Sequence, residues 1–243
     1  MRAALFATCL IDRMLPAAGV AAGRLLRALG VDVMVPAGQT CCGQPAFNSG
    51  YPDEARRVAL HTLHVFEGED LCVVLPSGSC AVMLRHHYHE LLGPAHAVAA
   101  ASLARRTFEL SSFIVNVLGI TRLGRGLTGQ RIVYHHGCHG LRELGLHDEP
   151  RLLLQNAGAE LLPWDAAEEC CGFGGLFAVK MPEVSVAMAD RKLDTLPAPR
   201  PDALTSADGG CLLQLEGRMK YRGIEVPVRH LAELLLEAVD GRS

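Results

Sequence analysis

Two pairs of adjacent cysteines, each followed by glycine, are the residues of this chain best suited to chemistry. The pairs are Cys41-Cys42 and Cys170-Cys171, and they lie 129 residues apart. A lone cysteine precedes each pair at the same interval and another follows it, so eight of the nine cysteines form two matching sets. The repetition indicates an internal duplication. The first cysteine set is Cys9, Cys41, Cys42 and Cys80, and the second cysteine set is Cys138, Cys170, Cys171 and Cys211.

Each set offers four thiols, and thiolates are soft ligands that favour zinc or iron–sulfur clusters. Structural zinc usually takes cysteines from knuckles with a few residues between them. Adjacent cysteines fit one zinc ion poorly, because the planar peptide between them restricts both side chains. They can bind two different irons of one cluster, and the glycine after each pair lets backbone N–H groups approach its sulfides. We therefore expect one iron–sulfur cluster in each half, with a zinc-stabilised interaction protein and metal-free thiol chemistry as alternatives.

The composition argues against several other classes of protein. The net charge is −3, so no basic excess indicates nucleic-acid binding. No apolar run reaches the roughly 18 residues of a membrane span, and residues 1–8 are too short for a signal peptide. Nine cysteines without such a signal indicate metal or redox chemistry in a reducing compartment, so we expect a cytoplasmic protein. Cys72 lies outside the repeat and is expected to be a small buried side chain.

Strands and helices alternate along the chain, and each cysteine group follows the end of an expected strand. Because ligands bind at the carboxyl edge of open α/β sheets, this placement favours a shared site there. The expected strands are 3–7, 31–35, 71–75, 131–135, 159–162, 202–205 and 225–228. The expected helices are 16–29, 52–66, 94–118, 149–156, 183–196 and 231–239.

This alternation predicts an α/β protein of two pseudo-symmetric repeats of Rossmann-like βαβαβ type, with parallel sheets and right-handed crossovers. The glycine-containing segment 119–130 separates the repeats. We expect a first cysteine-rich domain at residues 1–122 and a second at 123–243, referred to below as the first and second halves. A pseudo-two-fold relation would make the two cysteine sets face one another across the domain interface.

Longer stretches around the cysteines resemble a known family. Tyr134–Gly145 is similar to the segment YHDSCHGLREL, and Cys170–Lys180 to the segment CCGFGGTFAVK, of the lactate utilization protein A (LutA/YkgE) family. This family belongs to the iron–sulfur oxidoreductase subunits with cysteine-rich CCG domains, and the resemblance runs from Cys9 to about Gly217. It implies an iron–sulfur electron-transfer subunit that acts with a LutB-like iron–sulfur protein and a LutC-like protein to oxidise L-lactate to pyruvate.

The chain departs from the full family motif at one position in each half. That motif ends in C-x₂-C, and its first cysteine is replaced by Ser77 in the first half and by Asp208 in the second. Four thiolates per half suffice for an ordinary [4Fe–4S] cluster, so up to one such cluster per half is implied. The departure disfavours the alternative function, a catalytic thiol or disulfide oxidoreductase similar to heterodisulfide reductase. Ser77 and Asp208 are expected to cap a turn or helix, with oxygen ligation as the other possibility.

Three residues close to the cysteines are candidates for catalysis. His139 could donate a proton to substrate or a hydrogen bond to cluster sulfur. Arg142 and Lys180 could balance the charge of a cluster or hold the carboxylate of lactate. Packing for His139, and a solvated surface for Arg142 and Lys180, are the alternatives. The neighbouring His135 and His136 are expected to pack in the core.

Overall fold

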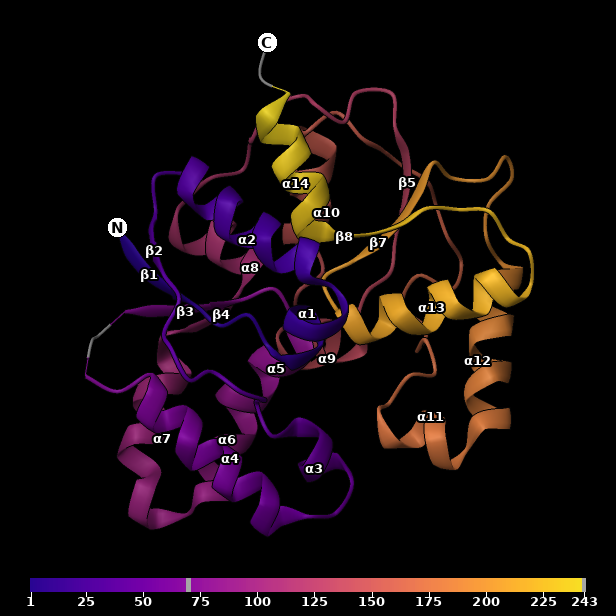
Figure 1. The fold of residues 1–243 in the computed structure, drawn as a ribbon. Coiled ribbons are helices and arrows are strands. Elements are labelled where there is room, and N and C mark those ends of the chain that lie inside the picture. Colours follow the sequence, from indigo (N-terminus) through magenta and orange to yellow (C-terminus); the bar gives the residue numbers. More distant parts are fainter. Residues whose placement is uncertain (69–70, 242–243) are drawn as a thin grey trace.

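Two parallel sheets form the framework of the molecule, one from each half of the chain (Figure 1). The computed structural model describes residues 1–68 and 71–241, and the elements named below lie within them. The strand order is β2-β1-β3-β4 in the first sheet and β6-β5-β7-β8 in the second. The matching order confirms an α/β protein of two Rossmann-like repeats. The strands are β1 (Arg2–Leu5), β2 (Asp32–Met34), β3 (Cys72–Leu75), β4 (Thr107–Glu109), β5 (Arg131–Tyr134), β6 (Glu160–Leu161), β7 (Ala203–Ser206) and β8 (Val228–His230).

Helices connect successive strands and surround the sheets. Proline opens or nearly opens α2, α4, α10 and α12, where its missing backbone N–H costs little. Across the described residues, no helix is long and apolar enough to cross a bilayer. The α-helices are α1 (Cys9–Met14), α2 (Pro16–Ala28), α3 (Gln44–Asn48), α4 (Pro52–Val65), α5 (Gly78–Val82), α6 (Tyr88–Leu92), α7 (Ala97–Arg105), α8 (Leu110–Ser112), α9 (Cys138–Glu143), α10 (Glu149–Asn156), α11 (Leu176–Lys180), α12 (Pro182–Asp194), α13 (Gly209–Tyr221) and α14 (Leu231–Asp240). Shorter turns of other types are η1 (Met83–His87), η2 (Pro94–His96) and η3 (Phe113–Val117).

Two expected elements differ from those observed. The expected helix 94–118 is interrupted by β4, whose residues pair with β3 from Val73↔Thr107 to Leu75↔Glu109. A three-residue strand is too short to show alternation in the sequence, and its pairing with a buried neighbour decides its conformation. The expected strand 225–228 lies later, as β8, because its register is set by pairing with β7. The proposed boundary between residues 122 and 123 falls in the irregular segment between η3 and β5.

The two halves share a hydrophobic core. One buried cluster contains Leu5 and Val74 of the first sheet together with Ile132 and Tyr134 of the second. Helix α14 of the second half packs against α2 of the first, and α8 of the first half packs against α10 of the second (Figure 1). The cysteine-bearing helices also meet across the halves, α1 with α13 and α5 with α9. This arrangement brings the carboxyl ends of the two sheets together.

Candidate functional site

Both cysteine sets lie beyond the carboxyl ends of the strands, as the sequence predicts. Cys9 begins α1 directly after β1, and Cys138 begins α9 directly after β5. Cys80 and Cys211 lie in the first turns of α5 and α13, which follow β3 and β7. The adjacent pairs occupy the loops that precede α3 and α11. The repeated fold therefore presents two similar arrays of thiols at one end of each sheet.

The two arrays line a single cavity of about 210 Å³ between the halves. Its other lining residues include Thr8, Leu10, Ile11 and Phe173, so the walls are largely apolar. The two cysteine sets thus face one another, as the pseudo-two-fold relation predicts. The cysteines that line the cavity are Cys9, Cys42, Cys80, Cys138, Cys170, Cys171 and Cys211. The remaining member, Cys41, has its sulfur 3.7 Å from that of Cys9.

The thiols of both sets converge without forming disulfides. In the first set the sulfurs of Cys42 and Cys80 are 3.2 Å apart. Backbone N–H groups point at the sulfurs in both halves. Gly43 donates to Cys41 at 3.3 Å, and Gly172 donates to Cys170 at 3.4 Å. Both glycines have positive φ, 89° and 84°, a conformation that places the N–H close to the preceding sulfur.

Hydrogen bonding sets the order in which these thiols ionise. The pKa of Cys41 falls to about 3 because its sulfur accepts hydrogen bonds from Cys42 and Cys9. The pKa of Cys170 falls to about 2 because it accepts from Cys138 and Cys171. The donors become harder to ionise, and the pKa of Cys9 is raised mainly by its bond to Cys41. In each half, hydrogen bonding therefore favours ionisation of the first cysteine of the pair.

These residues fit a thiolate-bound metal centre in each half. Four thiols converge, the first cysteine of each pair has a lowered pKa, and backbone N–H groups are directed at sulfur, which are the features that hold iron–sulfur clusters. The hydrophobic surroundings suit the same chemistry, since Cys42 and Cys80 belong to one buried apolar cluster and Cys171 to another. The four members of each set are the residues that would hold such a group.

His135 contributes to the second set in a way that the sequence did not reveal. A ring nitrogen of His135 and the sulfurs of Cys171 and Cys211 lie within 4.8 Å of one another. Nδ1 lies 3.3 Å from the carbonyl oxygen of Ala167 and therefore carries the proton, because a carbonyl only accepts. Nε2 is buried without a hydrogen-bond partner, and burial lowers the pKa of the ring to about 3. A neutral imidazole with one unpaired nitrogen thus lies beside Cys171 and Cys211 of the second set.

A second group of ligand-type residues has a different geometry. Ligand atoms of His136, His147 and Glu168 lie within 4.8 Å of one another. The two imidazole rings are stacked, with centroids 5.1 Å apart and planes 10° from parallel. Imidazole lone pairs lie in the ring plane, so two parallel rings cannot direct them at one point. This group is therefore a packing arrangement at the surface and does not form a metal site.

Ser77 and Asp208 have separate structural roles. The Ser77 hydroxyl accepts a hydrogen bond from the backbone N–H of Cys80 at 3.3 Å and caps α5, as expected. Asp208 precedes α13 but its side chain does not cap that helix. Its Oδ1 instead accepts from the hydroxyls of Ser77 and Ser79 in the other half, at 3.2 and 2.7 Å. The two residues that replace the missing cysteines, Ser77 and Asp208, therefore form a contact between the halves.

The structure separates the three candidate catalytic residues. His139 lines the cavity, and its Nδ1 lies 2.6 Å from Glu143 Oε1. Arg142 and Lys180 are exposed at the ends of α9 and α11, and neither lines the cavity. Lys192 was missed by the sequence reasoning and is fully buried. The sequence did contain a signal for this burial. Lys192 lies seven residues after Ser185 in α12, and residues seven apart share one face of a helix, so both lie on the buried face.

Comparison with known proteins agrees with the two-fold repeat. The family described as "Cysteine-rich domain" (CCG) matches residues 3–85 and again 132–216. A protein of Geobacillus sp. (strain WCH70) named "Lactate utilization protein A" is 45% identical over 97% of this chain and 99% of its own length. A protein of the same name from Exiguobacterium sp. is 43% identical over 97% of both chains. "Lactate utilization protein A 2" of Bacillus cereus (strain Q1) is 40% identical over 98% of this chain and 99% of its own.

Two matched cysteine-rich domains, nearly complete coverage and more than 40% identity leave little of the chain unmatched. The family profile ends shortly after the last cysteine of each set, so it spans the residues that surround the cavity. This chain belongs to the lactate utilization protein A family of proteins with two cysteine-rich CCG domains.

Proposed function

We propose that this chain is an iron–sulfur electron-transfer subunit of a cytoplasmic complex that oxidises L-lactate to pyruvate. The observation that carries the proposal is the pair of four-thiol sets facing one cavity. The names of the relatives support the link to lactate. Each set would hold one [4Fe–4S] cluster through its four cysteines, and each cluster would supply a one-electron redox centre when bound.

Oxidation of L-lactate to pyruvate releases two electrons and two protons, so two one-electron centres match its stoichiometry. The residues of this chain would hold the centres, screen them from water and pass the electrons to a LutB-like iron–sulfur partner. A LutC-like protein would complete the complex. The apolar side chains of Leu10, Ile11 and Phe173 in the cavity wall support this role, because they limit the access of water to the thiols.

The charges around the cavity support binding of lactate outside this chain. A carboxylate substrate needs a cationic or strongly donating partner, for which arginine is the usual choice. The lining residues include no lysine or arginine within the described chain, and they include Asp208, which would repel an anion. Arg142 and Lys180 lie outside the cavity. We therefore assign lactate binding to a partner subunit.

The proposal is tested by measuring iron, acid-labile sulfide and zinc per chain in protein purified without oxygen. About eight irons with equal sulfide are expected, which corresponds to two four-iron clusters. About four irons would restrict the proposal to one half. Zinc without sulfide would overturn it and would favour a structural metal site.

A further inference from the structure

The two halves place different residues at equivalent positions behind the cysteine pairs. Pro52 of α4 and Pro182 of α12 open equivalent helices, and both helices pack against the glycine after a cysteine pair. Ten residues after each proline stand Thr62 in the first half and Lys192 in the second. Both side chains are buried. One cysteine set thus has a neutral hydroxyl behind it where the other has an ammonium group.

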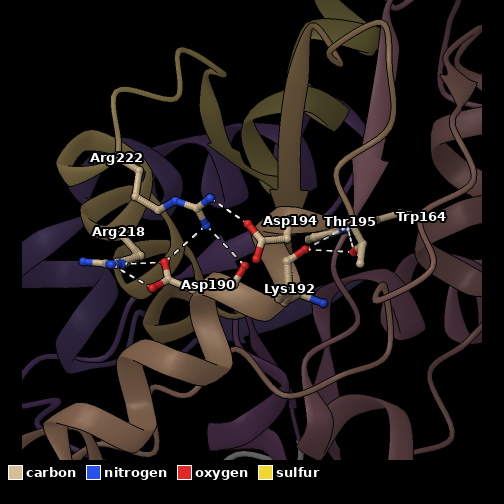
Figure 2. A network of polar contacts seen from close by, with 7 residues as sticks. All are labelled: Trp164, Asp190, Lys192, Asp194, Thr195, Arg218 and Arg222. Atoms are coloured by element: carbon tan, nitrogen blue, oxygen red, sulfur yellow. Dashed lines mark hydrogen bonds and ion pairs between the residues drawn. The ribbon is translucent and has the colours of Figure 1, made fainter.

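Lys192 is buried without a carboxylate partner. Its Nζ lies 4.1 Å from the centroid of the Trp164 ring and donates a hydrogen bond to the carbonyl oxygen of Ala166. Figure 2 shows the side chain beside Trp164, directed away from the acidic residues of its own helix. Within residues 1–68 and 71–241, the structure contains no ion pair to this ammonium. A carbonyl and an aromatic ring alone offset little of the cost of burying a charge.

The acidic residues nearby are already paired with arginines (Figure 2). Asp190 accepts two hydrogen bonds from Arg218, both at 2.7 Å. Asp194 accepts one from Arg222 at 2.6 Å. On the opposite side, Glu169 binds Arg191 at 3.2 Å. These pairs remove the carboxylates that would otherwise neutralise the buried lysine.

The second cysteine set supplies the compensating negative charge. Burial lowers the pKa of Lys192 to about 8, and negative charge on Cys171 and Cys211 would oppose that shift. His135 does not take over this role as a cation, since burial keeps its ring neutral. The position equivalent to His135 in the first half is Phe6, which is also buried. Lys192 is therefore the buried cation associated with the second set.

The first half has only neutral groups at the corresponding places. The Thr62 hydroxyl donates to the carbonyl oxygens of Val58 and Cys41, at 3.1 and 3.4 Å. The Tyr88 hydroxyl donates to the carbonyl oxygen of Cys42 at 2.8 Å. Burial raises the pKa of Tyr88, so it stays neutral. These hydroxyls bind backbone oxygens and bring no positive charge to the first set.

Building on the proposed function, we propose that Lys192 makes the second cysteine set the site of higher reduction potential. Reduction adds one negative charge to a thiolate-bound centre, and a buried ammonium stabilises that charge strongly because the surroundings have a low dielectric constant. An electron that enters the first set would move to the second, which oxidises one centre and reduces the other without any bond change. Electrons within the chain would then reside mainly on the second set.

The test is a redox titration followed by electron paramagnetic resonance, on protein prepared without oxygen. Cys41→Ala and Cys170→Ala leave one intact set each, so their midpoint potentials report the second and the first set separately. We expect the second set to hold its electron at least tenfold more tightly, which is 59 mV for a one-electron couple. Lys192→Met in the Cys41→Ala background should lower that potential by at least the same 59 mV.

Thr62→Val in the Cys170→Ala background is the matched control and should leave the first potential unchanged. Equal potentials in the two single-set proteins, or a Lys192→Met potential equal to that of its parent, would overturn the inference. If Lys192→Met does not retain iron, the comparison of the two single-set proteins decides alone. Absence of iron and sulfide from the wild-type protein would instead overturn the proposed function.

Discussion

The Ser77 hydroxyl donates a hydrogen bond to Asp208 Oδ1 at 3.2 Å, and these two residues occupy the same position in the two repeats. The backbone N–H of Ser79 donates to the same carboxylate oxygen at 3.1 Å. The carboxylate is buried and lies beside Gly137, where an added Cβ would overlap it. The loops that carry Cys80 and Cys211 are thus joined directly across the two halves.

Replacement of Asp208 by alanine should destabilise the protein by about 2 kcal/mol, because it removes the acceptor shared by the Ser77 hydroxyl and by the N–H and hydroxyl of Ser79. Urea denaturation followed by tryptophan fluorescence measures the change. Ser77→Ala removes one of the donors to Asp208 and the side-chain cap of α5, and should cost about 1 kcal/mol. A smaller loss for Asp208→Ala than for Ser77→Ala would contradict this account of the interface.

The buried carboxyl group of Glu109 should make the folding stability of the protein depend on pH. Burial raises the pKa of this carboxyl from 4.5 to about 7, and the charge of Asp208 acts in the same direction. Its Oε2 accepts hydrogen bonds from the backbone N–H groups of Ser111 and Ser112, while Oε1 has no partner. The folded state binds the proton more tightly than the unfolded state, so stability should fall as pH rises from about 4.5 to about 7.

This one group should lower the free energy of unfolding by about 3 kcal/mol over that pH range. Glu109→Gln should abolish this loss of stability with rising pH. The variant should therefore be more stable than wild type at pH 8, and the difference in stability between the two proteins should be smaller at pH 5. Urea denaturation at the two pH values measures the difference. Glu183→Gln, at an exposed position of α12, is the control and should preserve the wild-type dependence. An unchanged dependence in Glu109→Gln would show that another group is responsible.

Gly172 should tolerate no side chain. Its φ is 84°, and an added Cβ would overlap the carbonyl oxygen of Ser185. Gly172→Ala should therefore displace the loop of the second cysteine pair and reduce iron per chain by about half. Gly50→Ala is the control that introduces backbone strain without steric overlap. Gly50 has a φ of 80°, and no atom lies within 4 Å of an added Cβ. That variant should lose about 1–2 kcal/mol and keep its iron.

Loss of one cysteine should empty one set and spare the other. Cys41→Ala and Cys170→Ala should each retain about half of the wild-type iron and sulfide, because the sets are contributed by different sheets. Cys72→Ser, outside both sets, should retain all of it. Iron and sulfide analysis of the three variants distinguishes two separate centres from one centre shared by both sets, which either single loss would abolish.

The sequence was sufficient to predict the α/β repeats and the position of the eight repeated cysteines after strand ends, whereas Cys72, expected to be buried within a strand, begins β3 and is half-buried. Apolar runs of four or five residues such as 71–75 identify buried parallel strands, and the duplication sets the pairing order. Three-residue β4 could not be predicted, because it exists through its pairing with β3. The register of β8 depends in the same way on β7.

The candidate site was predicted less completely than the fold. The cysteines are recognisable from their types and spacing, whereas the role of His135 depends on which carbonyl its Nδ1 meets. Arg142 and Lys180 are close to cysteines in sequence but are exposed and lie outside the cavity, which the sequence distance alone could not show. Lys192 is far from the cysteines in sequence, and the packing of α12 brings it behind them.

The contacts of α2 with α14 and of α10 with α8 are one contact made twice about a pseudo-two-fold axis. Two identical single repeats would make the same isologous contact, so the chain has the architecture of a homodimer fused into one polypeptide. In a homodimer, any residue behind one cysteine pair must also stand behind the other. Fusion removes that constraint. It allows Thr62 to lie behind the first cysteine pair while Lys192 lies behind the second.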